Sequence, residues 1–343
     1  MKSIFKISAL ALGAAVLLCG CKSESSEYSN AVSTQSVGQS ANITEESQTD
    51  KAESQPTNPT VFERPSKEDD LLLNGAECGK NLTVYGSINN TDYSEYITKL
   101  EKILDNFEYN ISLAVYALDN SKALFYNTCH GIFGACTVKA PYSLYACMQM
   151  DDGNGSLAEE MVYSQKHYES GTGDMQYSPM GTAFTIETML YKSMAISDNV
   201  GYLMSVDRFG RDGYNKWISS IGCDSLEIKP TVWSLETKSN DLAVAWREMY
   251  YYFNSGAAHA DFLKKSCTNT RDNYATAALS NVQYSHKQGH NRSGEWHSFS
   301  DAGIVYKEGA PYIISVVTDS PGSTAAGRRV MADIIDIVHN DLF

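Results

Sequence analysis

The stretch "GIFGACTVKAPYSLYA", residues 131–146, decides how the rest of the chain is interpreted. It resembles the start of a buried helix, and it carries Lys139 three residues after Cys136. Residues three apart on a helix lie on one face, so the thiol and the amine can interact. Cys136 is therefore a candidate nucleophile, a candidate disulfide partner, or a remnant at a position that once carried out chemistry.

Two other short segments carry polar side chains that could belong to the same site. "ISDNVG", residues 196–201, places a Ser-Asp-Asn sequence at 197–199, in a break between two helical patterns. "YSHKQGHN", residues 284–291, places Lys-Gln-Gly at 287–289, toward the end of a predicted strand. Each segment alone is a weak signal, and the order of the three along the chain carries more information.

Hydrophobic periodicity predicts the elements around these segments. A helix is expected within residues 93–107, and two strands are expected within 111–127 around a turn at Asp119 and Asn120. Three helical patterns then fill residues 185–222. A long helix with a Ser or Asn cap follows, from about residue 239 until Gly256 stops it.

The end of the chain returns to strands and closes with a helix. Two strands are expected within residues 300–320, around Gly309 and Pro311, and an amphipathic helix within 323–343 turns Val330 and Ile334 inward, with Ile337 or Val338. Strands at both ends with helices between them predict a sheet built from both ends of the domain. An all-helical lobe is inserted in the chain, and clefts commonly lie between two such lobes.

The order and spacing of the three segments resemble the class A β-lactamase and penicillin-binding family of serine hydrolases, whose motifs are SxxK, SDN and KTG. The resemblance runs from about residue 110 to the end, and it includes "YESGTGDMQYSPMGTAFTIETML", residues 168–190. It implies a two-lobed β-lactamase-like fold over residues 71–343. One lobe is α/β with an antiparallel sheet and flanking helices, and the other is all-α. Only the SDN motif is intact.

The resemblance also implies a role for each motif residue. Cys136 takes the place of the nucleophilic Ser, and Lys139 is the neighbouring base. Ser197 would relay a proton, and Asn199 would bind the substrate amide. Lys287 would attract the substrate carboxylate, with Gln288 and Gly289 in the same motif. The amides of Cys136 and His290 would stabilise the oxyanion.

Three departures from the family pattern bear on activity. Cys replaces Ser; a thiolate near a Lys and a helix start forms more easily, but sulfur is larger than the oxygen for which such a site is shaped. Gln288 replaces the small hydroxyl residue of KTG. The ExxLN segment that supplies the water-activating Glu in the β-lactamases is missing, because Glu227 and Glu236 lack the Leu-Asn pair. Efficient β-lactam hydrolysis is therefore not expected.

Other interpretations of these residues stay open at the level of sequence. Cys136 could pair with Cys129 or Cys147, or be a small buried apolar residue. Lys139 could be structural and bond to Ser197 and Asn199, as in a catalytically inactive member that serves as a binding or scaffold module. A redox role for the cysteines is a third hypothesis.

A metal site is the weaker interpretation of the histidines. His286 and His290 would share one face of a strand and His297 lies nearby, but no further residue has a recognisable ligand spacing. The expectation is no metal and no cofactor.

The first 70 residues differ in composition from the rest. Lys2 and Lys6 precede an apolar run, residues 7–18, that is too short to span a bilayer but suits a signal peptide. The run ends in "LCGC", residues 18–21, which resembles a bacterial lipoprotein box and implies a signal peptide over residues 1–20 and lipidation of Cys21. Residues 21–70 are rich in Ser, Glu and Gln and predict a disordered tether, with an end-to-end distance on the order of 40 Å.

The charge and the predicted anchor indicate where the protein works. A net charge of −14 argues against nucleic-acid binding, which needs Lys and Arg to neutralise phosphates. We expect an extracytoplasmic, membrane-anchored monomer that acts on a small-molecule or peptide substrate at the cell envelope. Outside the cytoplasm some of its cysteines could pair, although the sequence does not say which.

Overall fold

The computed structural model describes residues 61–229, 236–270, 279, 282–291, 296–321 and 325–343. The expected signal peptide, Cys21 and most of the expected tether lie outside these residues. The described residues belong to one compact unit, which spans Asn58–Phe343. Among the helices described, none is long and apolar enough to cross a membrane.

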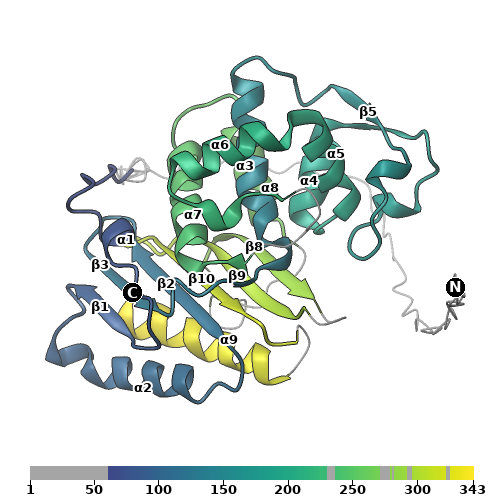
Figure 1. Ribbon diagram of the computed structural model, residues 1–343. Coiled ribbons are helices and arrows are strands. Elements are labelled where there is room, and N and C mark those ends of the chain that lie inside the picture. Colours follow the sequence, from purple (N-terminus) through teal and green to yellow (C-terminus); the bar gives the residue numbers. More distant parts are fainter. Residues whose placement is uncertain (1–60, 230–235, 271–278, 280–281, 292–295, 322–324) are drawn as a thin grey trace, which may run out of the picture. The chain divides into compact units, whose positions relative to one another are not determined.

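A six-stranded antiparallel sheet lies at the centre of this unit (Figure 1). Its order is β1-β3-β2-β10-β9-β8. The strands are β1 (Thr83–Gly86), β2 (Ile111–Ala117), β3 (Lys122–Tyr126), β8 (Tyr284–Asn291), β9 (Ser298–Val305) and β10 (Tyr312–Thr318). The central pairing joins β2 to β10, two strands almost 200 residues apart in the sequence. This confirms the prediction of a sheet built from both ends of the domain.

The predicted turn between β2 and β3 is present. Asn120 adopts φ +58°, a left-handed conformation that Asn tolerates better than most residues, and the Asp119 carboxylate accepts a hydrogen bond from the amide of Ser121 at 2.9 Å. The two strands therefore reverse where the sequence indicated.

Both faces of the sheet are buried. Successive side chains of a strand point to opposite faces, and in β2 Leu113 and Val115 pack in one apolar cluster while Ala114 and Tyr116 pack in the other. Helices α2 (Ser94–Asp105) and α9 (Ala325–Ile337) cover the first face (Figure 1). The periodicity predicted both helices correctly, although α9 continues as a π-helical turn over Val338–Leu342.

The other face carries the helical lobe. Its helices are α3 (Lys139–Asp151), α4 (Ile186–Ala195), α5 (Asn199–Phe209), α6 (Arg211–Ser220), α7 (Ser239–Phe253) and α8 (Ala260–Thr268). Helix α7 packs directly on β2, β9 and β10 (Figure 1). Its Trp246 is fully buried. The inserted helical lobe is confirmed, and the fold is the β-lactamase-like fold expected.

The predicted cap of α7 is wrong. The residue at the cap position is Lys238, and no side chain caps the helix. The hydroxyl of Ser239 instead hydrogen-bonds the hydroxyl of Ser112 in β2 at 2.6 Å. The local pattern predicted that Ser239 could cap the helix, but its side chain makes a buried contact with the sheet instead.

Residues 61–70 are described and contact the domain, so the predicted tether is wrong for these residues. Arg64 pairs with Glu248 of α7 at 2.5 Å, and Asp70 forms a fully buried ion pair with Arg247 at 2.6 Å. Asp70 also caps α1 (Leu71–Asn74) by accepting from the amide of Leu72. The polar composition of this segment did not predict its attachment, because ion pairs hold it to the domain together with Phe62, which packs against the core.

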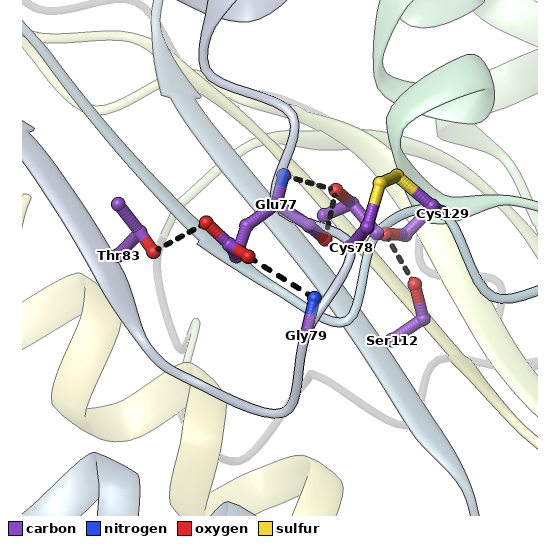
Figure 2. The surroundings of a disulfide bond; sticks show 8 residues. Glu77, Cys78, Gly79, Thr83, Ser112 and Cys129 are labelled. Atoms are coloured by element: carbon purple, nitrogen blue, oxygen red, sulfur yellow. Dashed lines mark hydrogen bonds between the residues drawn. A yellow bond between two sulfur atoms is a disulfide. The ribbon is translucent and has the colours of Figure 1, made fainter.

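A disulfide joins Cys78 to Cys129, across 51 residues (Figure 2). Beside it, the Glu77 carboxylate accepts hydrogen bonds from the amide of Gly79 and the hydroxyl of Thr83. The bridge excludes the proposed Cys136–Cys129 pair. Four cysteines of the described residues are free thiols, at positions 136, 147, 223 and 267, so Cys136 is not bonded to Cys147 either.

Candidate active site

Cys136 lies in a short 3₁₀ turn, η2 (Ala135–Val138), that runs directly into α3. The preceding residue, Ala135, adopts φ +47°, a strained conformation for a residue with a Cβ atom. Such strain is common at functional sites, and the position just before a helix start favours a thiolate. The structure thus holds the thiol at the kind of turn from which a nucleophile can act.

Strand β8 lies against this turn. A Cβ atom added to Gly289 would lie 2.0 Å from the carbonyl oxygen of Gly134, so only glycine fits at this position of the third motif. The same close approach carries Lys287 toward the turn. Close packing of β8 against this turn therefore explains why a glycine occupies position 289.

Lys139 is fully buried and points at the second motif. Its Nζ donates to the carbonyl oxygen of Ser197 at 2.7 Å and to Oδ1 of Asn199 at 2.8 Å, and it also hydrogen-bonds the Cys136 thiol. Burial lowers the pKa of the Lys139 ammonium, and the neighbouring thiol group opposes this shift. The structural bonds anticipated from the sequence are present, and the same amine also contacts the thiol.

The thiol of Cys136 is free and only partly exposed. Burial raises its pKa, but the positive charges of Lys139 and Lys287 and hydrogen bonds from Ser197 and Lys139 outweigh this effect and lower the pKa to about 7. A substantial fraction of the thiol is then thiolate at neutral pH, and the thiolate is the nucleophilic form.

Ser197 connects the second and third motifs. It adopts φ +59°, and its Oγ accepts a hydrogen bond from Lys287 Nζ at 2.9 Å. Lys287 is buried and also donates to the carbonyl oxygen of Gln288 at 2.9 Å. The structure therefore brings Cys136, Lys139, Ser197 and Lys287 together from three separate parts of the chain.

The other predicted site residues lie nearby with differing environments. Asn199 directs Oδ1 to Lys139, and its Nδ2 donates to the carbonyl oxygen of Ser170 at 3.0 Å. Gln288 is buried in β8 opposite Asp301, and His290 lies two residues further along, opposite Phe299. The binding roles of Asn199, Gln288 and His290 stay predictions.

The interval that supplies the water-activating Glu in the β-lactamases contains no matching carboxylate in its described part. Glu227 accepts from the hydroxyl of Ser219 at 2.8 Å, and Glu236 lies in β7 (Glu236–Thr237), opposite Phe133 of β4 (Ile132–Phe133). Residues 230–235 lie outside the described residues, and their sequence, PTVWSL, has no acid. The groups that lower the pKa of Cys136 are Lys139, Lys287 and Ser197, and none of these three is a carboxylate.

His286 is part of a buried polar network. Its Nδ1 hydrogen-bonds Asp301 at 2.9 Å, its Nε2 hydrogen-bonds the hydroxyl of Thr270, and its ring stacks on Tyr284. Both nitrogens are therefore engaged within the protein. Among the residues that the structure describes, no group of three or more His, Cys, Asp or Glu could hold a metal ion.

Thr172 belongs to the site and was not predicted from the sequence. Its hydroxyl donates to the carbonyl oxygen of Ser197 at 2.6 Å and lies 3.2 Å from Oδ1 of Asn199. The one signal for it is the "GTG" at 171–173, where two glycines flank a Thr inside the segment that resembles the family. Glycines in this arrangement indicate a special backbone conformation, but they do not say what it contacts.

The sheet order, the inserted helical lobe and the convergent lysines, serine and thiol define a protein of the β-lactamase-like class. Residues 95–342 match the model of the β-lactamase enzyme family (Beta-lactamase2), which is well over half of the chain. The chain therefore belongs to this family. No curated protein sequence matches it.

Solved structures with the same fold include PBP-A and two β-lactamases. PBP-A is 18% identical at a TM-score of 0.65, with 75% of this chain and 97% of PBP-A covered. A β-lactamase from Sphaerobacter thermophilus is 18% identical at 0.62, with 73% and 96% covered. An ancestral class A β-lactamase (GNCA) is 16% identical at 0.60, with 70% and 97% covered. At these identities the similarity establishes the fold.

Proposed function

We propose that this protein is an acyl-transfer enzyme of the cell envelope whose nucleophile is the Cys136 thiolate. Its substrate is a β-lactam or a peptidoglycan-type peptide. The observation that supports this proposal is the contact of one free thiol, with a pKa of about 7, with Lys139 and Ser197, next to the positive charge of Lys287. A mutant of PBP-A, a protein of the same fold, is known as an acyl-enzyme complex with penicillin G.

The first half of the reaction forms a thioester. The sulfur of Cys136 bonds to the carbonyl carbon, the π electrons move to the carbonyl oxygen, and the amides of Cys136 and His290 would stabilise that oxyanion. When the tetrahedral intermediate collapses, the C–N bond breaks and the Ser197 hydroxyl protonates the leaving nitrogen. Lys287, which donates to Ser197 Oγ at 2.9 Å, can return that proton. The positive charge of Lys139 stabilises the attacking thiolate.

The second half of the reaction breaks the thioester by attack of water or an amine. The ExxLN glutamate is missing from the sequence, and the described carboxylates of that interval are bonded elsewhere or exposed. Nothing in this set resembles a base that activates water. We therefore propose slow hydrolysis, so that a β-lactam would act as an acylating agent rather than as an efficiently hydrolysed substrate.

The site of action is also part of this proposal. The signal peptide and the lipoprotein box at Cys21 support export and lipid anchoring. The Cys78–Cys129 disulfide supports an oxidising compartment, because such bonds are rare in the cytosol. A Cys21→Ala variant should leave the membrane fraction; if it remains there as the wild type does, the anchoring proposal is wrong.

Labelling with a fluorescent penicillin tests the chemistry. We expect an adduct of the intact protein that maps to the peptide with Cys136 and is absent in Cys136→Ala. An unlabelled wild type, together with an unlabelled Cys136→Ser variant, would contradict the acyl-transfer proposal. That result would favour the catalytically inactive binding module, for which the bonds of Lys139 to Ser197 and Asn199 supply the specific support.

A further inference from the structure

Residues 170–176, here called the 170–176 loop, are bonded to the second motif at several points. The amide of Asn199 donates to the carbonyl oxygen of Thr172 at 3.1 Å, and its side chain donates to that of Ser170 at 3.0 Å. In return, the amide of Met175 donates to the Asp198 carboxylate at 2.9 Å. The loop and the motif are therefore joined through main-chain and side-chain atoms of both.

The shape of the loop depends on two glycines. Gly171 and Gly173 adopt φ +119° and +93°, conformations that residues with a side chain rarely adopt. A Cβ atom on Gly173 would lie 2.1 Å from the Asp198 carboxylate. The side-chain amide of Gln176 donates to the carbonyl oxygens of both glycines, at 3.0 and 2.8 Å. The backbone conformations of the two glycines and the hydrogen bonds from Gln176 thus hold the loop in one conformation.

This conformation places the Thr172 hydroxyl on the acceptors that Lys139 also uses. The carbonyl oxygen of Ser197 lies 2.6 Å from Thr172 Oγ1 and 2.7 Å from Lys139 Nζ. Oδ1 of Asn199 lies 3.2 Å from the hydroxyl and 2.8 Å from the amine. A carbonyl oxygen has two lone pairs, so it can accept from both donors at once.

The orientation of Ser197 matters because its two ends have different partners. Its carbonyl oxygen faces Thr172 and Lys139, and its Oγ contacts Lys287 and Cys136. Its backbone conformation, φ +59°, is unfavourable for a serine and persists only where neighbouring contacts impose it. Without the Thr172 hydroxyl, Lys139 would be the remaining donor to this carbonyl oxygen, and a small rotation of the peptide would carry Oγ away from the thiol.

We propose that Thr172 is a positioning residue of the active site: its hydroxyl holds the Ser197 carbonyl so that Ser197 Oγ and Lys139 Nζ both reach the Cys136 sulfur. Thr172 acts through Ser197 and Asn199, not on the substrate. The inference rests on the proposed function, because it concerns the thiolate that would perform the acyl transfer.

Loss of the Thr172 hydroxyl should weaken the stabilisation of the thiolate. In Thr172→Val the Ser197 hydroxyl no longer donates well to the sulfur, and Lys139 is less firmly placed. We expect the pKa of Cys136 to rise by about one pH unit, which reduces the thiolate fraction at pH 7 about fivefold. Because Thr172 is exposed, this variant is expected to fold.

The test is the rate of iodoacetamide alkylation of Cys136 as a function of pH, read by mass spectrometry of the Cys136 peptide in the full-length protein. The variants are Thr172→Val, Thr172→Ala and Thr172→Ser, with thermal unfolding measured for each. Thr182→Val is the matched control, because the Thr182 hydroxyl donates only to the nearby carbonyl oxygen of Pro179 at 2.7 Å.

We expect the alkylation midpoint to rise in Thr172→Val and Thr172→Ala, while Thr172→Ser and the control titrate as the wild type does. A Val or Ala variant with the wild-type midpoint, or a Ser variant as impaired as Val, overturns the role of Thr172. A wild type that titrates like an ordinary cysteine overturns the proposed function instead, so the two failures are distinguishable.

Discussion

Replacement of Lys139 by Met removes the positive charge that contributes most to stabilising the Cys136 thiolate. The methionine is apolar and of similar length, which suits the fully buried position. Burial alone raises the pKa of the thiol, and Lys139 is the first of the groups that oppose this effect. Lys139→Met should therefore return the pKa of Cys136 from about 7 to its ordinary value of 9.0 or above.

The size of the effect follows from these two values. A thiol of pKa 7 is about half ionised at pH 7, whereas a thiol of pKa 9 is about 1% ionised, a difference of roughly 50-fold in thiolate and roughly 3 kcal/mol in free energy. Because the pKa of Cys136 is lowered, the wild-type thiol is reactive above about pH 7 and loses its reactivity as the pH falls through this value. Alkylation of Lys139→Met at pH 7 should be about 50 times slower.

The assay is stopped-flow or quenched alkylation between pH 5 and pH 10, with Lys216→Met as the control because Lys216 is exposed on α6. The other free thiols of the described residues are buried, and burial raises the pKa of each, so they react slowly in the same range. If Lys139→Met and the wild type share one pH profile, the electrostatic account of Cys136 is refuted.

Three further predictions concern the framework of the site. Gly289→Ala should abolish penicillin labelling and lower stability by about 1–3 kcal/mol, because the new Cβ meets a backbone carbonyl oxygen at 2.0 Å; labelling at the wild-type rate would show that the strand can move aside. The Cys78→Ser, Cys129→Ser double variant should have a free energy of unfolding in urea about 4 kcal/mol lower than the wild type, the chain-entropy value for a 51-residue separation. Reductant should then lower the stability of the wild type and leave that of the double variant unchanged. Asp70→Ala should cost about 3–5 kcal/mol by leaving Arg247 buried without its partner, and a loss below 1 kcal/mol in the same assay would contradict this.

Local sequence patterns determined the order and type of most elements. The mainly apolar runs within residues 111–127 and 300–320 were sufficient to predict four of the six strands, because a strand that is buried on both faces consists mainly of apolar residues. The helical periods of residues 93–107 and 239–256 were equally clear. The cap of α7 was mispredicted, because Ser239 has a partner in β2 that the local pattern does not contain.

The chemistry of the site was only partly determined by the sequence. The spacing of Cys136 and Lys139 is a local property of one turn. Ser197 and Lys287 were predicted as site residues from the resemblance to a family. That these groups contact one another is a tertiary fact, because it requires β8 to lie against the turn before α3 and the α4–α5 break to face both.

Contacts between distant, individually unremarkable residues were decided by the tertiary structure alone. The partner of Cys129 is Cys78 rather than Cys136, Asp70 belongs to the domain through Arg247, and Thr172 reaches the site from 25 residues before Ser197. None of these pairings leaves a periodic pattern in the sequence. Periodicity records which face of an element is buried, whereas the choice of partner depends on how the whole chain packs.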